Sequence, residues 1–316
     1  MAIKDILEAL DDEVSIIHSS DFDIEITETN YVPTDSDSNL TFENFDSKYK
    51  KVKTIETCVL YVDIRKSTKL NLQHYPKTMA KLYSSFIRSM VKAAENYNGK
   101  IRNIVGDRLM VVFDSLDCFT NAVNTAFLMN TISQKIINKR FKNNAFTCGI
   151  GIDFGKMMVV KCGTIKYGNE NSVYKSLVWL GKPANIASKL TDSANKPSTY
   201  RTVSGFNVGF HFDSLYDDWS WYFETNEELV NNIEFSYLTP SMRYKSDYFK
   251  SFYATTKTYS NNDSTPPILV TKEVYKGFKK ANPYDDSIIN SWWKKQCRKI
   301  PDYSGTVYGS DVTFKW

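Results

Sequence analysis

The chain between residues 54 and 195 alternates between two patterns. Short, strongly apolar stretches predict buried strands, and longer stretches with apolar residues at every third or fourth position predict amphipathic helices. The predicted strands lie at residues 56–64, 100–105, 108–114 and 176–181. The predicted helices lie at residues 75–97, 115–138 and 183–194. Runs of this kind predict an α+β fold, in which an antiparallel sheet carries helices on one face.

Two hairpins are predicted inside this region. Gly106 and Asp107 join two of the strands, which is a sequence typical of a tight turn. Residues 146–163 form a second predicted hairpin, which turns at residues 153–156. The resulting order of elements, β-α-β-β-α-β, is that of a ferredoxin-like core to which further strands and a helix are added.

The regions that flank this core differ from it in composition. Residues 1–50 begin with a short helical pattern and continue with many Ser, Asp, Asn and Thr residues, which indicates an acidic N-terminal arm. The predicted core spans residues 51–195. Residues 196–262 mix many aromatic residues with Asn, Ser and Asp, and we expect a folded insertion because so many aromatic residues argue against disorder. Strand and helix patterns resume in residues 263–316, which we expect to complete the core domain.

The composition is that of an ordinary globular protein, with 316 residues of which 42% are hydrophobic and 24% are charged. A net charge of +4 is small for this length and gives no reason to expect binding to nucleic acid or to an anionic membrane. The five cysteines show no C-x-x-C spacing, which argues against disulfides or zinc and for a reducing cytosol. No stretch of the sequence approaches the roughly 18 apolar residues of a membrane span. We therefore expect a soluble, cytoplasmic protein.

Two aspartates attract attention because of where the predicted elements place them. Asp63 ends a strand that should be buried, where an uncompensated carboxylate costs several kcal/mol in order of magnitude. Asp107 lies at the tip of the first hairpin. In a β-α-β-β unit these two positions can lie side by side, and two neighbouring carboxylates repel unless a proton or a cation lies between them. Mg²⁺ or Mn²⁺ suits such a pair. The alternative is that Asp63 caps a turn and Asp107 is an ordinary turn residue.

Four motifs, in this order, resemble the class III adenylate and guanylate cyclases. The motifs are VLYVDIRKST (59–68), NIVGDRLMVVF (103–113), GIGIDFGKMMVVKCG (149–163) and WLGKPANIASKL (179–190). The resemblance covers about residues 55–195. It implies a nucleotidyl cyclase, which closes a nucleoside triphosphate into a 3′,5′-cyclic monophosphate with release of diphosphate.

The resemblance implies a role for each residue that matches a family motif. Asp63 and Asp107 would bind two divalent ions, with the backbone carbonyl of Ile64 as a further ligand. These ions would lower the pKa of the ribose 3′-hydroxyl and neutralise charge on the attacked phosphate. The loop after the first strand would bind the β- and γ-phosphates with its N–H groups and cations. This loop consists of Arg65, Lys66, Ser67 and Thr68.

Two further positions lie on the last predicted helix. Asn185 matches the asparagine that orients the ribose, and Lys189 stands where the family usually has arginine. Their i, i+4 spacing puts both on one helix face. Lysine keeps the positive charge but lacks the forked geometry of arginine, so stabilisation of the transition state is in doubt. The family also binds the triphosphate with a late lysine, for which Lys279 and Lys280 are candidates.

The residues at the base pocket depart from both purine-specific pairs of the family. Asn103 and Val178 occupy the two positions that select the base and offer one amide and one apolar wall. Tyr61 narrows the pocket, and Arg102 and Arg108 flank the hairpin, from which they could donate to a carbonyl of the base. A smaller pocket with few purine contacts suggests a pyrimidine.

A narrower resemblance agrees with this inference. Residues 31–33, 40–45 and 53–68 resemble the Pycsar-type pyrimidine cyclases of bacterial anti-phage defence. Those enzymes make cyclic CMP or cyclic UMP, which activates a separately encoded effector. An asparagine amide at position 103 can serve cytosine or uracil, and we favour CTP over UTP.

The resemblance also implies a homodimer with shared active sites. In the family one chain supplies the aspartates, and the other supplies the residues that correspond to Asn185 and Lys189. Two alternatives stay open. One is a catalytically inactive cyclase-like domain that senses a nucleotide, for which Lys189 speaks. The other is an adenylate or guanylate cyclase with an altered base pocket.

Overall fold

The computed structural model divides the chain into two compact units, which are described one at a time. The first unit consists of Met1–Lys196 and Thr265–Trp316, and the second consists of Pro197–Ser264. The structure describes residues 2–141, 146–166, 169–196, 199–211, 219–236, 241–261 and 264–315.

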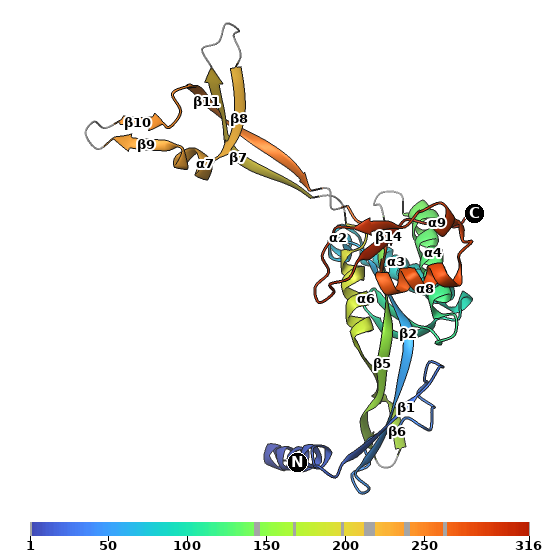
Figure 1. Ribbon diagram of the computed structural model, residues 1–316. Coiled ribbons are helices and arrows are strands. Elements are labelled where there is room, and N and C mark those ends of the chain that lie inside the picture. Colours follow the sequence, from blue (N-terminus) through green and yellow to red (C-terminus); the bar gives the residue numbers. More distant parts are fainter. Residues whose placement is uncertain are drawn as a thin grey trace. The chain divides into compact units, whose positions relative to one another are not determined.

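Within its described residues, the first unit is built on a sheet of nine strands (Figure 1). Seven of them follow the order β13-β14-β12-β5-β2-β4-β3, and β1 and β6 pair with β2 and β5 respectively. The strands are β1 (Asp23–Glu28), β2 (Tyr49–Ile64), β3 (Lys100–Val105), β4 (Arg108–Val112), β5 (Cys148–Lys166), β6 (Asn169–Leu180), β12 (Ile268–Thr271), β13 (Lys294–Gln296) and β14 (Val307–Ser310).

The described helices of this unit connect these strands. They are α1 (Ile3–Ile17), α2 (Ser67–Gln73), α3 (Pro76–Asn96), α4 (Cys118–Thr131) with its continuations η1 (Ile132–Ile137) and α5 (Asn138–Arg140), α6 (Lys182–Ser193), α8 (Lys272–Ala281) and α9 (Asp286–Ile289). The four central strands run β5-β2-β4-β3, each antiparallel to its neighbour, with α3 after β2 and α4 after β4. The predicted α+β, ferredoxin-like β-α-β-β-α-β core is therefore confirmed.

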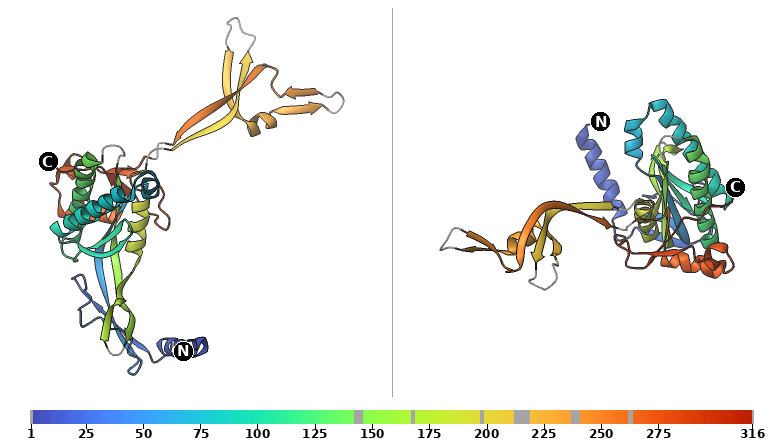
Figure 2. Two further views of the ribbon diagram at one scale, coloured as in Figure 1. Left: turned by 180° about the vertical axis from the view of Figure 1, so that it is seen from behind. Right: turned by 90° about the horizontal axis from the view of Figure 1, so that it is seen from above.

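The two faces of the central sheet carry different helices (Figure 2). Leu60, Val62 and Ile64 of β2 pack with the apolar residues of α3 and α4 in the largest core cluster. Val59 and Tyr61 belong to a cluster on the opposite face, which includes residues of α6. Because side chains alternate along a strand, Asp63 lies on the face of Val59 and Tyr61. The sheet thus separates Asp63 from the large core cluster under α3 and α4.

The predicted turn at residues 153–156 is wrong. These residues lie inside β5, which pairs with β2 without a break from Ile64↔Cys148 to Lys53↔Val159. The ladder hydrogen bonds of the long pair outweigh the turn preference of the local sequence. Asp153 is only 5% exposed, and its Oδ1 accepts a hydrogen bond from the Thr271 hydroxyl at 2.7 Å. Burial raises the pKa of Asp153 to about 6.

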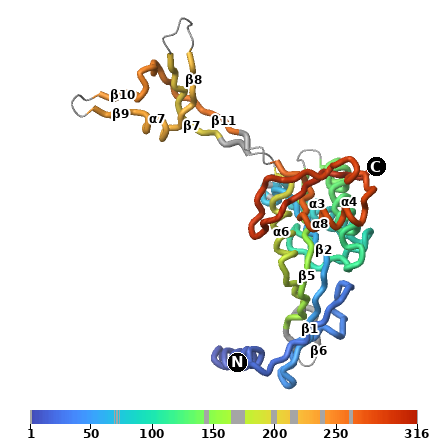
Figure 3. Tube along the Cα trace, in the orientation of Figure 1, coloured from blue at the N-terminus to red at the C-terminus, as the bar shows by residue number. Residues whose placement is uncertain are grey.

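The second unit contains a three-stranded antiparallel sheet in the order β11-β7-β8 (Figure 3). Its described elements are β7 (Thr199–His211), β8 (Trp219–Thr225), α7 (Asn226–Asn231), β9 (Ile233–Ser236), β10 (Ser241–Tyr244) and β11 (Phe249–Asn261). Aromatic rings pack against each other along these strands, as Trp219 and Trp221 do with centroids 5.6 Å apart. Across the described residues of both units, no helix combines the length and apolar character that crossing a bilayer requires.

Helix α6 rests directly on β5 because two positions of the strand have no side chain. A Cβ on Gly151 would lie 2.3 Å from the Ala187 carbonyl oxygen and 2.4 Å from the Thr191 nitrogen. A Cβ on Gly149 would lie 2.8 Å from the Thr191 carbonyl oxygen. These are backbone atoms of the helix, so a side chain at either position would push α6 away from the sheet.

We expect Gly151→Ala to lower the free energy of unfolding by about 1–3 kcal/mol, because the new methyl group meets helix backbone that cannot rotate away. Urea unfolding followed by circular dichroism measures the change. Gly106→Ala is the control, since no atom lies within 4 Å of its added Cβ and its φ of +62° alone costs about 1 kcal/mol. Equal losses from the two variants would contradict the seating of α6 on β5.

Candidate active site

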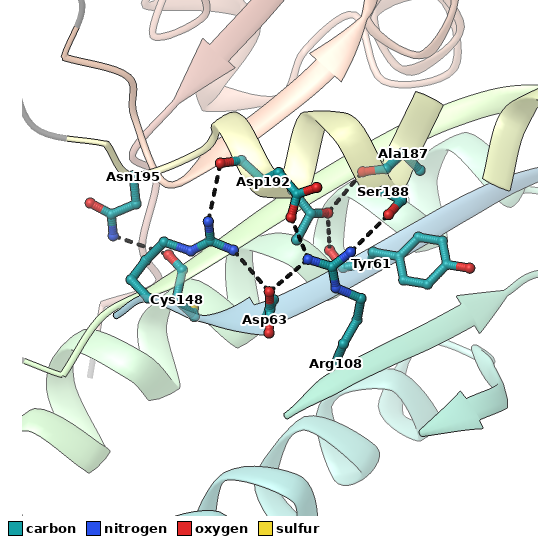
Figure 4. A network of polar contacts seen from close by, with 10 residues as sticks. Tyr61, Asp63, Arg108, Cys148, Ala187, Ser188, Asp192 and Asn195 are labelled. Atoms are coloured by element: carbon teal, nitrogen blue, oxygen red, sulfur yellow. Dashed lines mark hydrogen bonds and ion pairs between the residues drawn. The ribbon is translucent and has the colours of Figure 1, made fainter. Parts of the chain in front are cut away.

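The site is centred on Asp63, near the end of β2 and on the face that carries α6 (Figure 4). Its side chain is 16% exposed and accepts hydrogen bonds from two arginines through Oδ2. Arg108 donates from Nη2 at 2.7 Å, and Arg65 donates from Nη2 at 3.3 Å. The carboxylate that the sequence places at the end of a buried strand is therefore compensated by charge, as burial requires.

Arg108 connects this carboxylate to α6. Its Nη1 donates to the Ser188 hydroxyl at 2.8 Å, and its Nη2 also donates to the Asp192 carboxylate. Arg65 donates to the backbone carbonyl of Asp192 at 3.2 Å. Sequence reasoning did not identify Ser188 and Asp192. Their spacing of three and seven residues from Asn185 places them on the same stripe of the helix, which is the signal that could have found them.

The fit of Arg65 depends on Gly149, which lies opposite Asp63 in the β2–β5 register. A Cβ there would lie 2.9 Å from Arg65 Nε. The bare strand lets the guanidinium lie between β5 and α6 and reach the Asp63 carboxylate. The glycine therefore positions a charged group as well as a helix.

Asp107 lies next to this network at the tip of the β3–β4 hairpin. Burial, and after it the negative charge of Asp63, raises the pKa of Asp107, while a hydrogen bond with Ser67 opposes the shift. Its Oδ2 is buried and has no hydrogen-bond partner. The structure thus places the two aspartates of the sequence hypothesis close enough for their charges to interact.

The chemistry of this pair fits a divalent cation. Within the described part of the chain, no group of three His, Cys, Asp or Glu side chains converges on a common point, so a complete protein cage is absent there. Mg²⁺ needs no such cage, because it typically uses one or two carboxylates and takes its other ligands from water and substrate phosphates. The buried, unpaired oxygen of Asp107 beside Asp63 is the donor that such an ion would satisfy.

The loop predicted to bind phosphates follows β2 directly. Lys66 has a left-handed backbone with φ of 56° and precedes the short helix α2. Lys66 and Thr68 are exposed, whereas Ser67 is partly buried and interacts with Asp107. Arg65, which is predicted to bind phosphate, has its guanidinium turned inward to Asp63 and α6 in this structure.

Asn185 and Lys189 share a face of α6, as their spacing predicts. Asn185 is exposed, and Lys189 forms an ion pair with the exposed Asp302. Seven residues of helix, about 10 Å, separate Asn185 from Asp192, which contacts the Asp63 network. Ser188, one turn from Asn185, also contacts this network through Arg108, but Asn185 itself makes no hydrogen bond to Asp63 or Asp107 among the described residues.

The five predicted base-pocket residues fall into separate surroundings. Asn103 is exposed. Met110 of β4 pairs with Asn103 on one side and with Tyr61 on the other, so the three residues form one row across the sheet. Arg102 stacks over the Trp179 ring at 5.9 Å, in a cavity of about 430 Å³ between β3, β6 and the N-terminal segment. Val178 comes directly before Trp179 on β6, and its side chain is exposed.

Arg108, Lys279 and Lys280 are the remaining residues named from the sequence. Arg108 contacts Asp63 and α6 in this structure, where the sequence hypothesis has it facing the base. Lys279 and Lys280 are exposed in the last turn of α8. The geometry gives no reason to prefer either lysine for the triphosphate.

Sequence comparisons with known proteins point to one family. The model of the adenylate and guanylate cyclase catalytic domain matches residues 49–203. A uridylate cyclase from Burkholderia cepacia is 30% identical over 179 residues, which cover 55% of this chain and 72% of that protein. A cytidylate cyclase from Staphylococcus aureus is 30% identical over 167 residues, which cover 49% of this chain and 37% of that protein. Among solved structures, the adenylyl cyclase CyaB from P. aeruginosa aligns with a TM-score of 0.46 at 15% identity, over 82% of this chain and 95% of that one.

We expect Arg108→Gln to lower the free energy of unfolding by about 1–3 kcal/mol when divalent ions are chelated, because it leaves the carboxylates of Asp63, Asp107 and Asp192 with less compensating charge. Thermal and urea unfolding in EDTA measure the effect. Arg140→Gln, at an exposed position, serves as the control and should change stability by less than about 0.5 kcal/mol. If the two variants unfold alike, the arginine network does not form in solution.

Proposed function

Because this chain belongs to the class III nucleotidyl cyclases, we propose that it closes a pyrimidine nucleoside triphosphate into a 3′,5′-cyclic monophosphate with release of diphosphate. Members of this family produce cyclic nucleotides and generally use two divalent metal ions. One observation carries the proposal at the level of residues: Asp107 holds a buried, unpartnered carboxylate oxygen beside Asp63. We assign the catalytic core to residues 51–195 with residues 263–316 as its completion, and treat residues 1–50 and 196–262 as additions.

In this proposal Asp63 and Asp107 hold the metal ions, Mg²⁺ or Mn²⁺, together with the carbonyl of Ile64. Bound ions of this kind neutralise charge on the attacked phosphate and make the ribose 3′-hydroxyl more acidic. Arg108 would have to leave Oδ2 of Asp63 for an ion to bind there, and its contacts with Ser188 and Asp192 would hold the guanidinium from the other side. The loop formed by Arg65, Lys66, Ser67 and Thr68 binds the β- and γ-phosphates.

We propose that two copies of the chain share each active site. The exposure of Asn185, which makes no hydrogen bond to Asp63, Asp107 or Arg108 within the described part of its own chain, supports this arrangement. Lys189 would exchange its pair with Asp302 for the substrate. Such an exposed ion pair contributes only about 0–1 kcal/mol, so the exchange costs little.

The identity of the base rests on the pocket and on the relatives. Tyr61 is large and partly buried, and Asn103 offers a single amide, so we propose a pyrimidine. Six of the eight matching relatives are named uridylate cyclases, and two are named cytidylate cyclases. We therefore place UTP before CTP, which reverses the order favoured from the sequence.

We further propose that the cyclic nucleotide is a second messenger in anti-phage defence. The support is the resemblance of residues 31–33, 40–45 and 53–68 to the Pycsar-type cyclases. A separate effector protein would bind the messenger, so the chain itself needs no contact with that effector, with nucleic acid or with a membrane.

Mixing experiments test the shared site. Asp63→Ala and Asn185→Ala protein should each lose at least about 100-fold in activity, because each lacks one half of the site. Random reassembly of equal amounts should recover about a quarter of the wild-type rate, since half of the dimers then hold one intact site of two. Asp63→Ala mixed with Asp107→Ala is the control and should stay inactive, because both changes affect the same half. Absence of recovery in the first mixture would rule out sharing.

Incubation with ATP, GTP, CTP and UTP in the presence of Mn²⁺ tests the substrate, with products separated by chromatography and identified by mass. We expect cyclic UMP or cyclic CMP to exceed either purine product by at least about tenfold, because the pocket lacks purine contacts. Asp107→Ala protein controls for contaminating cyclases. A dominant purine product would refute the pyrimidine assignment and leave the cyclase intact. No cyclic product from any nucleotide would favour the nucleotide-sensing domain.

A further inference from the structure

Helix α1 carries an apolar stripe that nothing in the described first unit covers. Five large apolar residues lie along one side of the helix, and none of the helix residues is buried. They are Ile3, Ile6, Leu7, Leu10 and Val14, with exposed fractions between 43% and 78%. An apolar face of this kind is stable in a protein only when another surface covers it.

The polar side of α1 restricts what that surface can be. The helix contains five acidic residues and only one lysine. Asp11 and Glu13 flank the stripe, where residues of a paired helix would meet. Two copies of α1 side by side would therefore bring like charges together, which opposes pairing. An anionic membrane is opposed for the same reason.

Helix α3 offers a groove of complementary character. The groove has a volume of about 650 Å³ and lies between α3 and Gly106 of the β3–β4 hairpin. Tyr83, Ile87 and Val91 give it an apolar floor at four-residue steps. Two exposed basic residues, Arg88 and Lys92, line it together with one acid, Glu95, so its net charge is positive. The floor is about 12 Å long, and the stripe from Leu7 to Val14 is about 10 Å long.

The α1 of the same chain cannot reach this groove while β1 stays paired. Strand β1 begins at Asp23, opposite Tyr49 at the start of β2, whereas the hairpin lies at the other end of β2, beyond Val62. These ends of β2 are about 43 Å apart. The segment between α1 and β1 together with the helix as far as Leu10 spans at most about 31 Å. The helix that fills the groove must come from another molecule.

We propose that α1 of one copy docks in the α3 groove of a second copy, with its apolar stripe on the floor and its acidic residues beside Arg88 and Lys92. In a twofold dimer this contact occurs twice, once in each direction. The proposal does not depend on the reaction that the chain catalyses. It gives the N-terminal arm a role in assembly.

Cross-linking between separately made full-length variants tests the contact. One protein carries Leu10→Cys and the other carries Val91→Cys, each with Cys297→Ser and Cys162→Ser to remove the partly exposed native thiols. Oxidation of the mixture should give a covalent dimer, because docking brings the two Cα atoms within disulfide range, about 4.4–6.8 Å. Asp12→Cys, on the opposite side of α1, replaces Leu10→Cys in the control and should give at least about fivefold less dimer. No covalent dimer, or equal yields from both mixtures, would overturn the proposal.

Charge reversal provides a second measurement. Arg88→Glu with Lys92→Glu should reduce the cross-linking yield about fivefold or more, and Asp11→Lys with Glu13→Lys on the other chain should restore it. Circular dichroism confirms that each variant is folded. A cross-linking yield that stays the same in both sets of variants would mean that the stripe docks elsewhere, which also overturns the proposal.

Discussion

Two carboxylates held close together in a partly buried site require a positive charge, and much of the first unit is arranged around that requirement. Asp63 comes from β2 and Asp107 from the β3–β4 turn, and Arg65 and Arg108 both donate to Oδ2 of Asp63. Arg108 extends the charge network to α6, so the electrostatic balance of the acids also fixes a helix. The same need for positive charge makes the pair a natural place for divalent ions, which supply more charge than an arginine does.

Helix α6 therefore takes part in two interactions that point in different directions. Ser188 and Asp192 contact Arg108 of their own chain, whereas Asn185 is exposed and Lys189 pairs with Asp302. A single stripe of four polar residues can join the two halves of a shared site, because about 10 Å of helix separates its ends. The glycines of β5 make this possible by letting the helix backbone approach the sheet.

The sequence alone predicts the central strands and helices well, because their apolar periodicity agrees with their packing: β2, α3 and α6 lie within a few residues of the expected bounds, apart from the earlier start of β2. It fails at residues 153–156, where a turn-like sequence lies within a strand whose partner is distant in the chain. Asp192 escapes notice because an acid on a helix surface gains meaning only when the arginine opposite it is known. The proposed docking of α1 in the α3 groove cannot be predicted from the sequence either, because the groove exists only in the folded chain.

The long β2–β5 ladder has a consequence for the fidelity of folding. Its register decides on which face Asp63 lies, and a shift of one residue would exchange the two faces of β2. Asp63 would then enter the apolar core beneath α3 and α4, and Val62 and Ile64 would replace it beside the arginines. Such a chain would bury an unpaired carboxylate and expose core residues. It would therefore lose both stability and the pairing of Asp63 with the arginines. The misaligned form is therefore less stable than the native one. At equilibrium nearly all folded chains have Asp63 on the face that carries the arginines.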